Sequence, residues 1–138
     1  MDLNSYQALL EHRAIIRKKT FLKKLYFDFY QEFTNASLVE GKIIELGSGA
    51  GFLKELMPHV VTSDVIDGPD IDKVFFADKI PFKSSSVAAF LMIDVLHHIK
   101  DPKKALIEME RCLKKGGKII MVEPYISAWG SFIYKYIH

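Results

Sequence analysis

The seven residues from Val87 to Ile93, VAAFLMI, are apolar without interruption. A strand with one face in water alternates apolar and polar side chains, so an unbroken run is typical of a parallel strand covered on both faces. Further segments have the length and composition of strands, namely Lys42–Leu46, His59–Asp64, Lys73–Phe76 and Lys118–Glu123. The run therefore predicts an α/β fold in which this strand lies near the centre of a parallel sheet.

Helical patterns alternate with these strands. The expected helices are residues 4–36, in two segments that meet near Thr20, residues 51–57, and a helix that starts at Pro102. Asp101 is expected to cap the last of these, and Gly116–Gly117 to end it. The connection VIDGPDID, residues 65–72, is too short for a full crossover helix, so a loop or a single turn is expected. Alternating strands and helices predict a parallel sheet with helices on both faces.

The size and composition of the chain fit one domain. It has 138 residues and a net charge of +2, which by itself is too small to indicate a nucleic-acid partner. Its one cysteine, Cys112, excludes an intrachain disulfide and favours a reducing compartment, so a cytoplasmic location is expected. No stretch approaches the ~18 apolar residues of a transmembrane helix.

A glycine-rich turn, ELGSGAG, follows the first expected strand. A loop that cradles a nucleoside triphosphate needs Gly-x4-Gly-Lys-Ser/Thr, and no such lysine is present. The dinucleotide fingerprint needs Gly-x-Gly-x-x-Gly, whereas here the third glycine, Gly51, comes one residue early and Phe52 takes its place. Glu45 lies two residues before the first glycine. A carboxylate there suits a ligand with a positive group better than it suits a phosphate.

The segment from Glu45 to Gly51 resembles the glycine turn of the class I S-adenosylmethionine-dependent methyltransferases, in particular those of type 11. Two further segments, IPFKSSSVAAFLMIDVLHHIKDP and LKKGGKIIMVEP, are similar to the family's fourth and fifth strands and their flanking turns. Asp64 ends the second strand, where the family has an acidic residue. These matches cover about residues 40–125, which the resemblance identifies as a cofactor-binding core behind an N-terminal helical segment, residues 1–38.

The resemblance implies that the cofactor is S-adenosylmethionine, with S-adenosylhomocysteine as product. Its methionine part would be held by residues of the glycine turn, namely Glu45, Gly47, Ser48, Gly49 and Gly51. Within this set, Glu45 would interact with the ammonium group. The alternative for Glu45 is a sheet-end carboxylate that caps nearby amides.

The remaining cofactor contacts implied by the resemblance involve two aspartates. Asp64 would accept bonds from the ribose hydroxyls, since a carboxylate can accept several at once; the alternative is a strand-end turn residue. Asp78 would contact the adenine amino group, although its spacing to Pro81 is shorter than in the family. Ile80 or Phe82 are the alternative, as apolar walls for the adenine ring.

Asp94 and His97 follow the fourth expected strand and should line the ligand cleft. Asp94 would also contact the cofactor. A histidine titrates near neutrality and can act as a general base, but a structural role for His97 is the alternative. No clustered set of metal ligands is evident, so no metal is expected.

The resemblance departs from the family at the end of the chain. The family sheet has seven strands in the order 3-2-1-4-5-7-6, and residues 126–138 correspond to the start of the helix after strand five. The expected sheet is therefore Rossmann-like, ordered 3-2-1-4-5 without strands 6 and 7, as in a fragment or a truncated product. Strand five would be an exposed edge that could self-associate, unless the aromatic tail covers it.

Basic residues gather in the N-terminal segment, namely Arg17, Lys18, Lys19, Lys23 and Lys24. Such a cluster could bind phosphate, RNA or an anionic membrane. A solvated helix face is the favoured interpretation, because no stacking motif accompanies the cluster.

The function implied by the resemblance is methyl transfer to a small-molecule or lipid-like acceptor, whose pocket the N-terminal helices would help to shape. Two alternatives remain open at this point. One is a cofactor-binding module without catalysis, and the other is an NAD-dependent oxidoreductase, which the glycine spacing disfavours.

Overall fold

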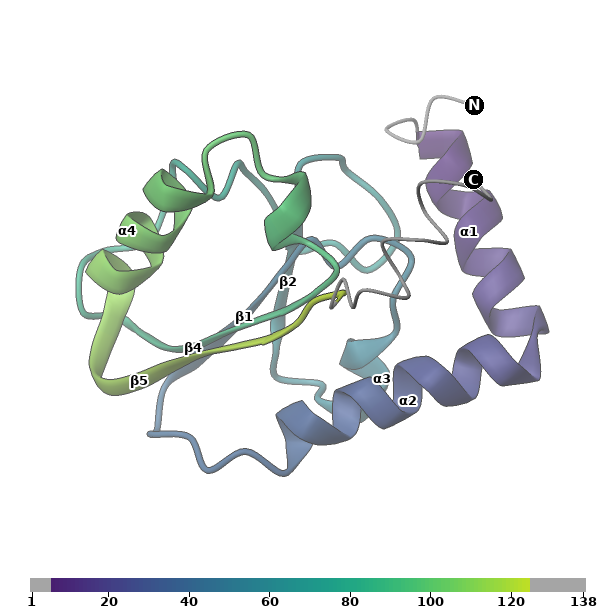
Figure 1. Ribbon diagram of the computed structural model, residues 1–138, viewed down its shortest axis with the longest axis horizontal. Coiled ribbons are helices and arrows are strands. Elements are labelled where there is room, and N and C mark those ends of the chain that lie inside the picture. Colours follow the sequence, from purple (N-terminus) through teal and green to yellow (C-terminus); the bar gives the residue numbers. More distant parts are fainter. Residues whose placement is uncertain (1–5, 125–138) are drawn as a thin grey trace, which may run out of the picture.

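The computed structural model describes residues 6–124, which form a five-stranded parallel sheet (Figure 1). The strands are β1 (Lys42–Leu46), β2 (Val61–Asp64), β3 (Lys73–Val74), β4 (Val87–Ile93) and β5 (Leu113–Val122). Their order in the sheet is β3-β2-β1-β4-β5, and every neighbouring pair is parallel. The expected order 3-2-1-4-5 is confirmed. The helix expected within residues 126–138 lies outside the described residues.

The helices follow the expected plan. They are α1 (Tyr6–Lys18), α2 (Thr20–Thr34), α3 (Leu53–Leu56), the 3-10 turn η1 (Leu96–His98) and α4 (Pro102–Cys112). The break between α1 and α2 lies at Lys19, whose backbone is extended. Asp101 caps α4 as expected, because its side chain accepts a hydrogen bond from the Lys104 N–H at 3.0 Å. Residues 65–72 form bends and a turn without a helix, which confirms the sequence-based expectation.

Helices cover both faces of the sheet, with α4 on one side and α2 and α3 on the other (Figure 1). On β4, Ala89 and Leu91 belong to the apolar cluster on the side of α2 and α3. Phe90 and Met92 point the opposite way, into the cluster that contains the buried residues of α4. Every residue from Val87 to Met92 is fully buried. The unbroken apolar run is therefore explained by burial on both faces.

The end of α4 differs from the prediction. The helix stops at Cys112, and Leu113 takes an extended backbone and pairs with Val87 of β4. The next pair joins Ala89 to Lys118, so residues 114–117 form an irregular bulge in β5. Gly116 has φ +79°, a conformation that favours glycine. Gly116 and its neighbour therefore shape a bulge in the strand, and the expectation that they end the helix is wrong.

Two strands are shorter than predicted. β2 begins at Val61 because the preceding residues form a turn, in which the Val60 N–H donates to the Met57 carbonyl at 3.0 Å. β3 ends at Val74, and Phe76, which was expected to belong to it, is 66% exposed. Both differences lie at strand ends, where tertiary contacts decide the boundary.

The carboxyl ends of the parallel strands lie at one edge of the sheet. The chain leaves β1 toward β2 on one side, and β4 lies on the other side of β1, so the strand order reverses between β1 and β4. Ligands of open α/β sheets bind in the crevice that such a reversal creates. Helices α1 and α2 meet at an angle beside this edge (Figure 1).

Candidate functional site

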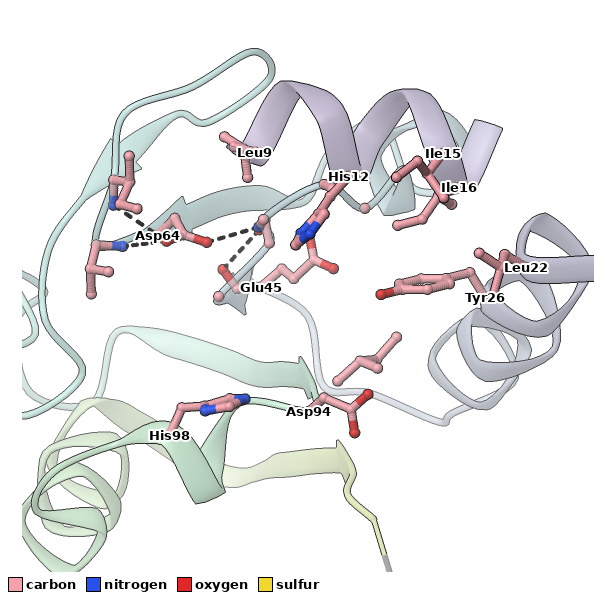
Figure 2. Close-up of a pocket in the computed structure, with 18 of the residues that line it drawn as sticks. Leu9, His12, Ile15, Ile16, Leu22, Tyr26, Glu45, Asp64, Asp94 and His98 are labelled. Atoms are coloured by element: carbon pink, nitrogen blue, oxygen red, sulfur yellow. Dashed lines mark hydrogen bonds between the residues drawn. The ribbon is translucent and has the colours of Figure 1, made fainter. Parts of the chain in front are cut away.

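A pocket of about 470 Å³ opens at the carboxyl ends of β1, β2 and β4 (Figure 2). Its floor is the glycine turn after β1, and α1 and α2 supply the opposite wall. Ligand pockets for small molecules have volumes of roughly 300–1,000 Å³. The pocket is therefore large enough for a nucleoside-sized ligand.

The physical constraint that favours glycine differs from one position of the turn to the next. Gly47 and Gly49 both have positive φ, +63° and +47°. A Cβ on Gly47 would lie 2.5 Å from the Val95 side chain, so packing excludes it. A Cβ on Gly49 would meet nothing closer than 3.7 Å. A Cβ at Gly49 would therefore meet only ordinary contacts, with Asp64 and Leu9 as the nearest side chains, and this residue lines the pocket.

Gly51 makes room for α2. A Cβ at this position would lie 2.3 Å from the hydroxyl oxygen of Tyr30, which is buried in the core. That hydroxyl accepts a hydrogen bond from the Phe52 N–H at 3.0 Å. Tyr30 thereby satisfies a backbone donor just before α3, where a helix start leaves donors unpaired. The glycine at this position is required by internal packing.

Asp64 joins the end of β2 to the glycine turn. Its Oδ2 accepts a hydrogen bond from the Gly49 N–H at 2.8 Å, and its Oδ1 accepts from the N–H groups of Val65 and Ile66 at 2.7 and 3.3 Å (Figure 2). The carboxylate also lines the pocket. Two carboxylate oxygens offer about four acceptor sites, so this side chain can hold the loop and still accept from a ligand.

Glu45 is the buried acid of the site, with only 4% of its surface exposed, and it lines the pocket. Burial raises the pKa of its carboxyl to about 7; the Ser48 hydroxyl lowers the pKa, and the charge of Asp64 raises it. A neighbouring cation would favour the ionised form. The side chain is consequently poised to take a negative charge when a positive group enters the pocket.

Asp94 lies directly after β4 and lines the pocket opposite the glycine turn (Figure 2). Its φ of +54° is unusual for a residue other than glycine, although aspartate tolerates it better than most. Its N–H donates to the Val122 carbonyl of β5 at 2.8 Å, which helps to hold this conformation.

Burial raises the pKa of the Tyr26 hydroxyl on α2, and the negative charges of Asp94 and Glu45 raise this pKa further.

His97, which the sequence predicted to line the site, is not part of the pocket lining, although its ring centroid lies 4.0 Å from that of His98. Its Nδ1 lies 2.7 Å from Oε2 of Glu123 at the end of β5. The other oxygen of Glu123 accepts from the Val95 and Leu96 N–H groups at 2.9 and 2.7 Å. His97 and Glu123 together hold η1 in place, and the next residue, His98, lines the pocket instead.

The three candidates for adenine contact also lie outside the pocket lining. Asp78 forms an ion pair with Lys104 of α4 at 3.6 Å. Ile80 and Phe82 are buried in the apolar cluster on the α4 side of the sheet. The apolar walls come instead from α1, α2, the segment after β2 and the end of β4, namely Leu9, Ile15, Ile16, Leu22, Tyr26, Val65, Ile66 and Ile93.

The residues of α1 were not identified from the sequence. Leu9, His12 and Ile16 recur at steps of three and four residues, so their shared helix face could have been found by periodicity. Nothing in the sequence indicates that this face of α1 lies over the edge of the sheet. His12 extends from α1 toward Glu45 (Figure 2).

Two arginines connect α1 to the rest of the site. The Arg13 guanidinium donates to the Pro69 carbonyl at 3.0 Å and forms an ion pair with Asp70. One turn later, Arg17 pairs with Glu55 of α3 at 2.5 Å. Both partners follow strands whose ends form the pocket floor, so the two ion pairs hold α1 across the pocket.

Within residues 6–124, no group of three or more histidine, cysteine, aspartate or glutamate side chains is arranged to hold a metal ion. No helix in the same range is long and apolar enough to span a membrane.

Comparison with known proteins agrees with this architecture. A family model described as a methyltransferase domain matches residues 44–121, more than half of the chain. The chain therefore belongs to this methyltransferase-domain family. The match includes the glycine turn, Asp64 and Asp94, and it leaves α1 and α2 outside.

Curated relatives with a recognised activity match parts of the chain. A demethylmenaquinone methyltransferase from Renibacterium salmoninarum is 38% identical over 65 residues, which are 46% of this chain and 27% of that protein. A demethylmenaquinone methyltransferase from Paenarthrobacter aurescens is 29% identical over 113 residues, 70% of this chain and 45% of that protein. The chain thus matches less than half the length of these relatives.

Solved structures support the fold. A Methanococcus maripaludis protein, provisionally described as an S-adenosyl-L-methionine-dependent methyltransferase, superimposes with a TM-score of 0.71 at 18% identity, over 96% of this chain and 73% of that chain. A SAM-dependent methyltransferase from Thermotoga maritima superimposes with a TM-score of 0.63 at 24% identity, over 80% of this chain and 57% of that chain. The fold is the Rossmann-like methyltransferase fold.

Proposed function

We propose that this chain forms the cofactor-binding part of an S-adenosylmethionine-dependent methyltransferase that acts on a small, lipid-like acceptor. The observation that carries the proposal is the pocket at the ends of β1, β2 and β4. There the glycine turn lies among three carboxylates that line the same pocket, namely Glu45, Asp64 and Asp94. Membership of the methyltransferase-domain family supports the same activity.

The residues of the pocket fit the charge of the cofactor. S-adenosylmethionine carries a sulfonium and an ammonium group, and a pocket with three carboxylates favours such a cation. The raised pKa of Glu45 adds a specific expectation, because an ammonium group nearby would return this carboxyl to its ionised form. Asp64 has acceptor capacity left for the hydroxyls of a ribose.

When bound, S-adenosylmethionine supplies an electrophilic methyl group on its sulfonium. The protein's contribution is then to bind, to orient and to exclude water. The apolar wall from α1 and α2 serves to keep water out of the pocket. For an acceptor hydroxyl, a group must also take a proton, and two histidines, His12 and His98, line the pocket where such a base would be needed.

The acceptor class rests on the wall opposite the glycine turn. Leu9, Ile15, Ile16 and Leu22 make it apolar, and Tyr26 adds an aromatic ring. Such a surface suits an aromatic or isoprenoid-like acceptor better than a sugar or a peptide. The two curated relatives are demethylmenaquinone methyltransferases, which supports an acceptor of this kind.

Cofactor binding can be measured before any acceptor is known. We expect S-adenosylmethionine and S-adenosylhomocysteine to raise the melting temperature, and NADH to leave it unchanged. Asp64→Ala should weaken cofactor affinity roughly 10- to 100-fold, since hydrogen bonds to a charged group contribute about 1.5–3 kcal/mol. Isothermal titration calorimetry gives the affinities directly.

Asp67→Ala is the matched control. Asp67 lies three residues after Asp64, is exposed and is not part of the pocket lining. Its replacement should leave the affinity unchanged. Stabilisation by NADH alone would overturn the proposal in favour of an oxidoreductase. Cofactor binding that is equally strong in Asp64→Ala and Asp67→Ala would remove Asp64 from the site.

A further inference from the structure

The junction of α1 and α2 projects from the body of the molecule. We call residues 15–24, which contain this junction, the elbow. In Figure 1 it forms the corner where the two helices meet, away from the sheet. The surrounding sequence from Arg13 to Phe27 contains six lysines and arginines and no acidic residue. A segment of one charge sign at a projecting corner is a candidate interaction surface.

Large apolar side chains are exposed at the elbow. Phe21, in the first turn of α2, is 74% exposed, and Ile15 near the end of α1 is 43% exposed. Phe21 is the most exposed of the large apolar side chains in the described part of the chain. Apolar groups in this setting gain by leaving water, so a partner that accepts them would be favoured.

The cations of the elbow divide into two groups. Arg17 pairs with Glu55, and Lys24 pairs with Asp28 of its own helix. Lys18, Lys19 and Lys23 are exposed and have no ion pair with any of the described residues. They flank Phe21 in the sequence on both sides. The elbow therefore offers an aromatic ring bordered by lysines that form no ion pair within residues 6–124.

We propose that the elbow docks the protein on an anionic lipid surface, with Phe21 entering the boundary between headgroups and acyl chains. Lys18, Lys19 and Lys23 would then face the lipid phosphates. Interfacial helices use this combination of basic side chains and exposed aromatic or aliphatic ones. The phosphates of a nucleic acid could also pair with the lysines, and a base could stack on Phe21. A nucleic acid has no apolar interior, however, that could accept the side chain of Ile15.

The elbow also adjoins the pocket. Ile15 is both exposed and part of the pocket lining, and Leu22, next to Phe21 in the chain, lines the pocket as well. Docking here would bring one wall of the pocket close to the lipid surface, where an apolar ligand could pass between them. The inference goes beyond the proposed methyl transfer and does not depend on it.

Vesicle sedimentation tests the proposal without cofactor or acceptor. The protein is mixed with vesicles of phosphatidylcholine alone or of phosphatidylcholine with phosphatidylglycerol. We expect binding to the anionic vesicles only, weakening as salt is raised. The variant Lys18→Gln/Lys19→Gln/Lys23→Gln should reduce the partition coefficient on the order of 100-fold, since each lysine near such a surface contributes a factor of about 5. Phe21→Ser should reduce it on the order of 10-fold.

Matched controls come from positions outside the elbow. Lys79→Gln/Lys83→Gln/Lys103→Gln removes the same charge from exposed positions, and Phe76→Ser removes another exposed phenylalanine, 66% exposed just after β3. Both controls should bind like the original chain. All substituted side chains are exposed, so melting curves should stay unchanged and exclude misfolding as a cause.

Three outcomes would overturn the proposal. The first is an absence of binding to the anionic vesicles. The second is an equal loss in the elbow and control variants, which would show a response to net charge alone. The third is elbow-dependent binding to a single-stranded polyuridine oligonucleotide without binding to vesicles, which would assign the elbow to nucleic acid.

Discussion

At the scale of single residues, the glycine turn serves two purposes that its sequence does not separate. Gly49 exposes its backbone to the pocket and donates its N–H to Asp64. Gly51, two residues later, is small because the Tyr30 hydroxyl occupies the space where its side chain would lie. The same residue type therefore serves ligand approach at one position and helix packing at the next.

Alanine substitutions should separate the two roles. Gly51→Ala places a methyl group against the Tyr30 hydroxyl and the Ser48 carbonyl, so we expect about 1–3 kcal/mol lower free energy of unfolding from overpacking. In a Tyr30→Phe background the same change should cost less, because one of the two clashing oxygens is gone. Urea denaturation measures both values.

Gly49→Ala is the comparison for this experiment. Its Cβ meets nothing closer than 3.7 Å, so its cost should come from the positive φ alone, about 1–2 kcal/mol. Unlike the cost of Gly51→Ala, this cost should be the same in the original chain and in the Tyr30→Phe background. A Gly51→Ala cost that does not change in the Tyr30→Phe background would show that the hydroxyl is not the obstacle.

At the scale of elements, α1 has few residues buried in the core and is held largely by the ion pairs of two arginines. Two of its residues are buried, Ala8 and Ile16, and only Ile16 belongs to an apolar cluster of the sheet. Leu9 packs beside Gly68, and polar contacts join Arg13 to Pro69 and Asp70 and Arg17 to Glu55. An element with few buried apolar contacts opens more readily than the sheet below it.

Arg13→Ala should therefore loosen α1 without affecting the sheet. Loss of the contacts with Pro69 and Asp70 is expected to cost about 1 kcal/mol, which corresponds to roughly 5-fold faster amide exchange in residues 6–18. Hydrogen-exchange mass spectrometry measures the amide exchange of α1 separately from that of β1 and β4. Lys24→Ala, which removes an ion pair within α2, is the control and should leave α1 unchanged. Equal acceleration in α1 and β4 would mean that the helix opens only with the whole domain.

At the scale of the whole molecule, helices cover both faces of the sheet, and β5 is one of the two edge strands formed by residues 6–124. Its neighbour on one side is β4, and no other strand among residues 6–124 pairs with it. Met121 on this strand is 37% exposed. Self-association through this edge stays a prediction, which concentration-dependent sedimentation can examine.

The buried acid of the pocket should influence the stability of the whole domain. The pKa of Glu45 is raised from an ordinary value of 4.5 to about 7, so the folded state binds this proton more tightly than the unfolded state. Its contribution to the free energy of unfolding is therefore fully present below pH 4.5 and is lost as the pH rises to about 7. The loss amounts to about 3 kcal/mol.

Glu45→Gln should remove this part of the pH dependence. The variant is expected to gain stability relative to the original chain between pH 4.5 and 7, with a constant difference above pH 7. Chemical denaturation at a series of pH values measures the difference, in which the contributions of unchanged groups cancel. Parallel profiles for the two proteins would show that the Glu45 carboxyl is ionised in the folded state across this range.

Local sequence was sufficient for a parallel α/β sheet and for most element positions, whereas the order of the strands was implied by the family resemblance. Periodicity and backbone preferences act between residues that are close in the sequence. They are sufficient to recognise the apolar strand VAAFLMI, the alternation of strands and helices, and the helix cap at Asp101. The family resemblance, together with the position of Glu45, Asp64 and Asp94 at the ends of parallel strands, indicated a ligand near these three residues. These residues do line one pocket.

Only the tertiary structure decided which other residues share that pocket. His97 and His98 are adjacent in the sequence, yet the His97 ring is engaged by Glu123 and, of the two, His98 is the one that lines the pocket. Asp78 pairs with Lys104, and α1 crosses the sheet edge because Arg13 reaches a loop 56 residues away. Such outcomes depend on contacts between distant segments, whereas periodicity and turn chemistry report on neighbours alone. The sequence by itself thus determined the sheet and one edge of the pocket, and long-range packing decided its opposite wall.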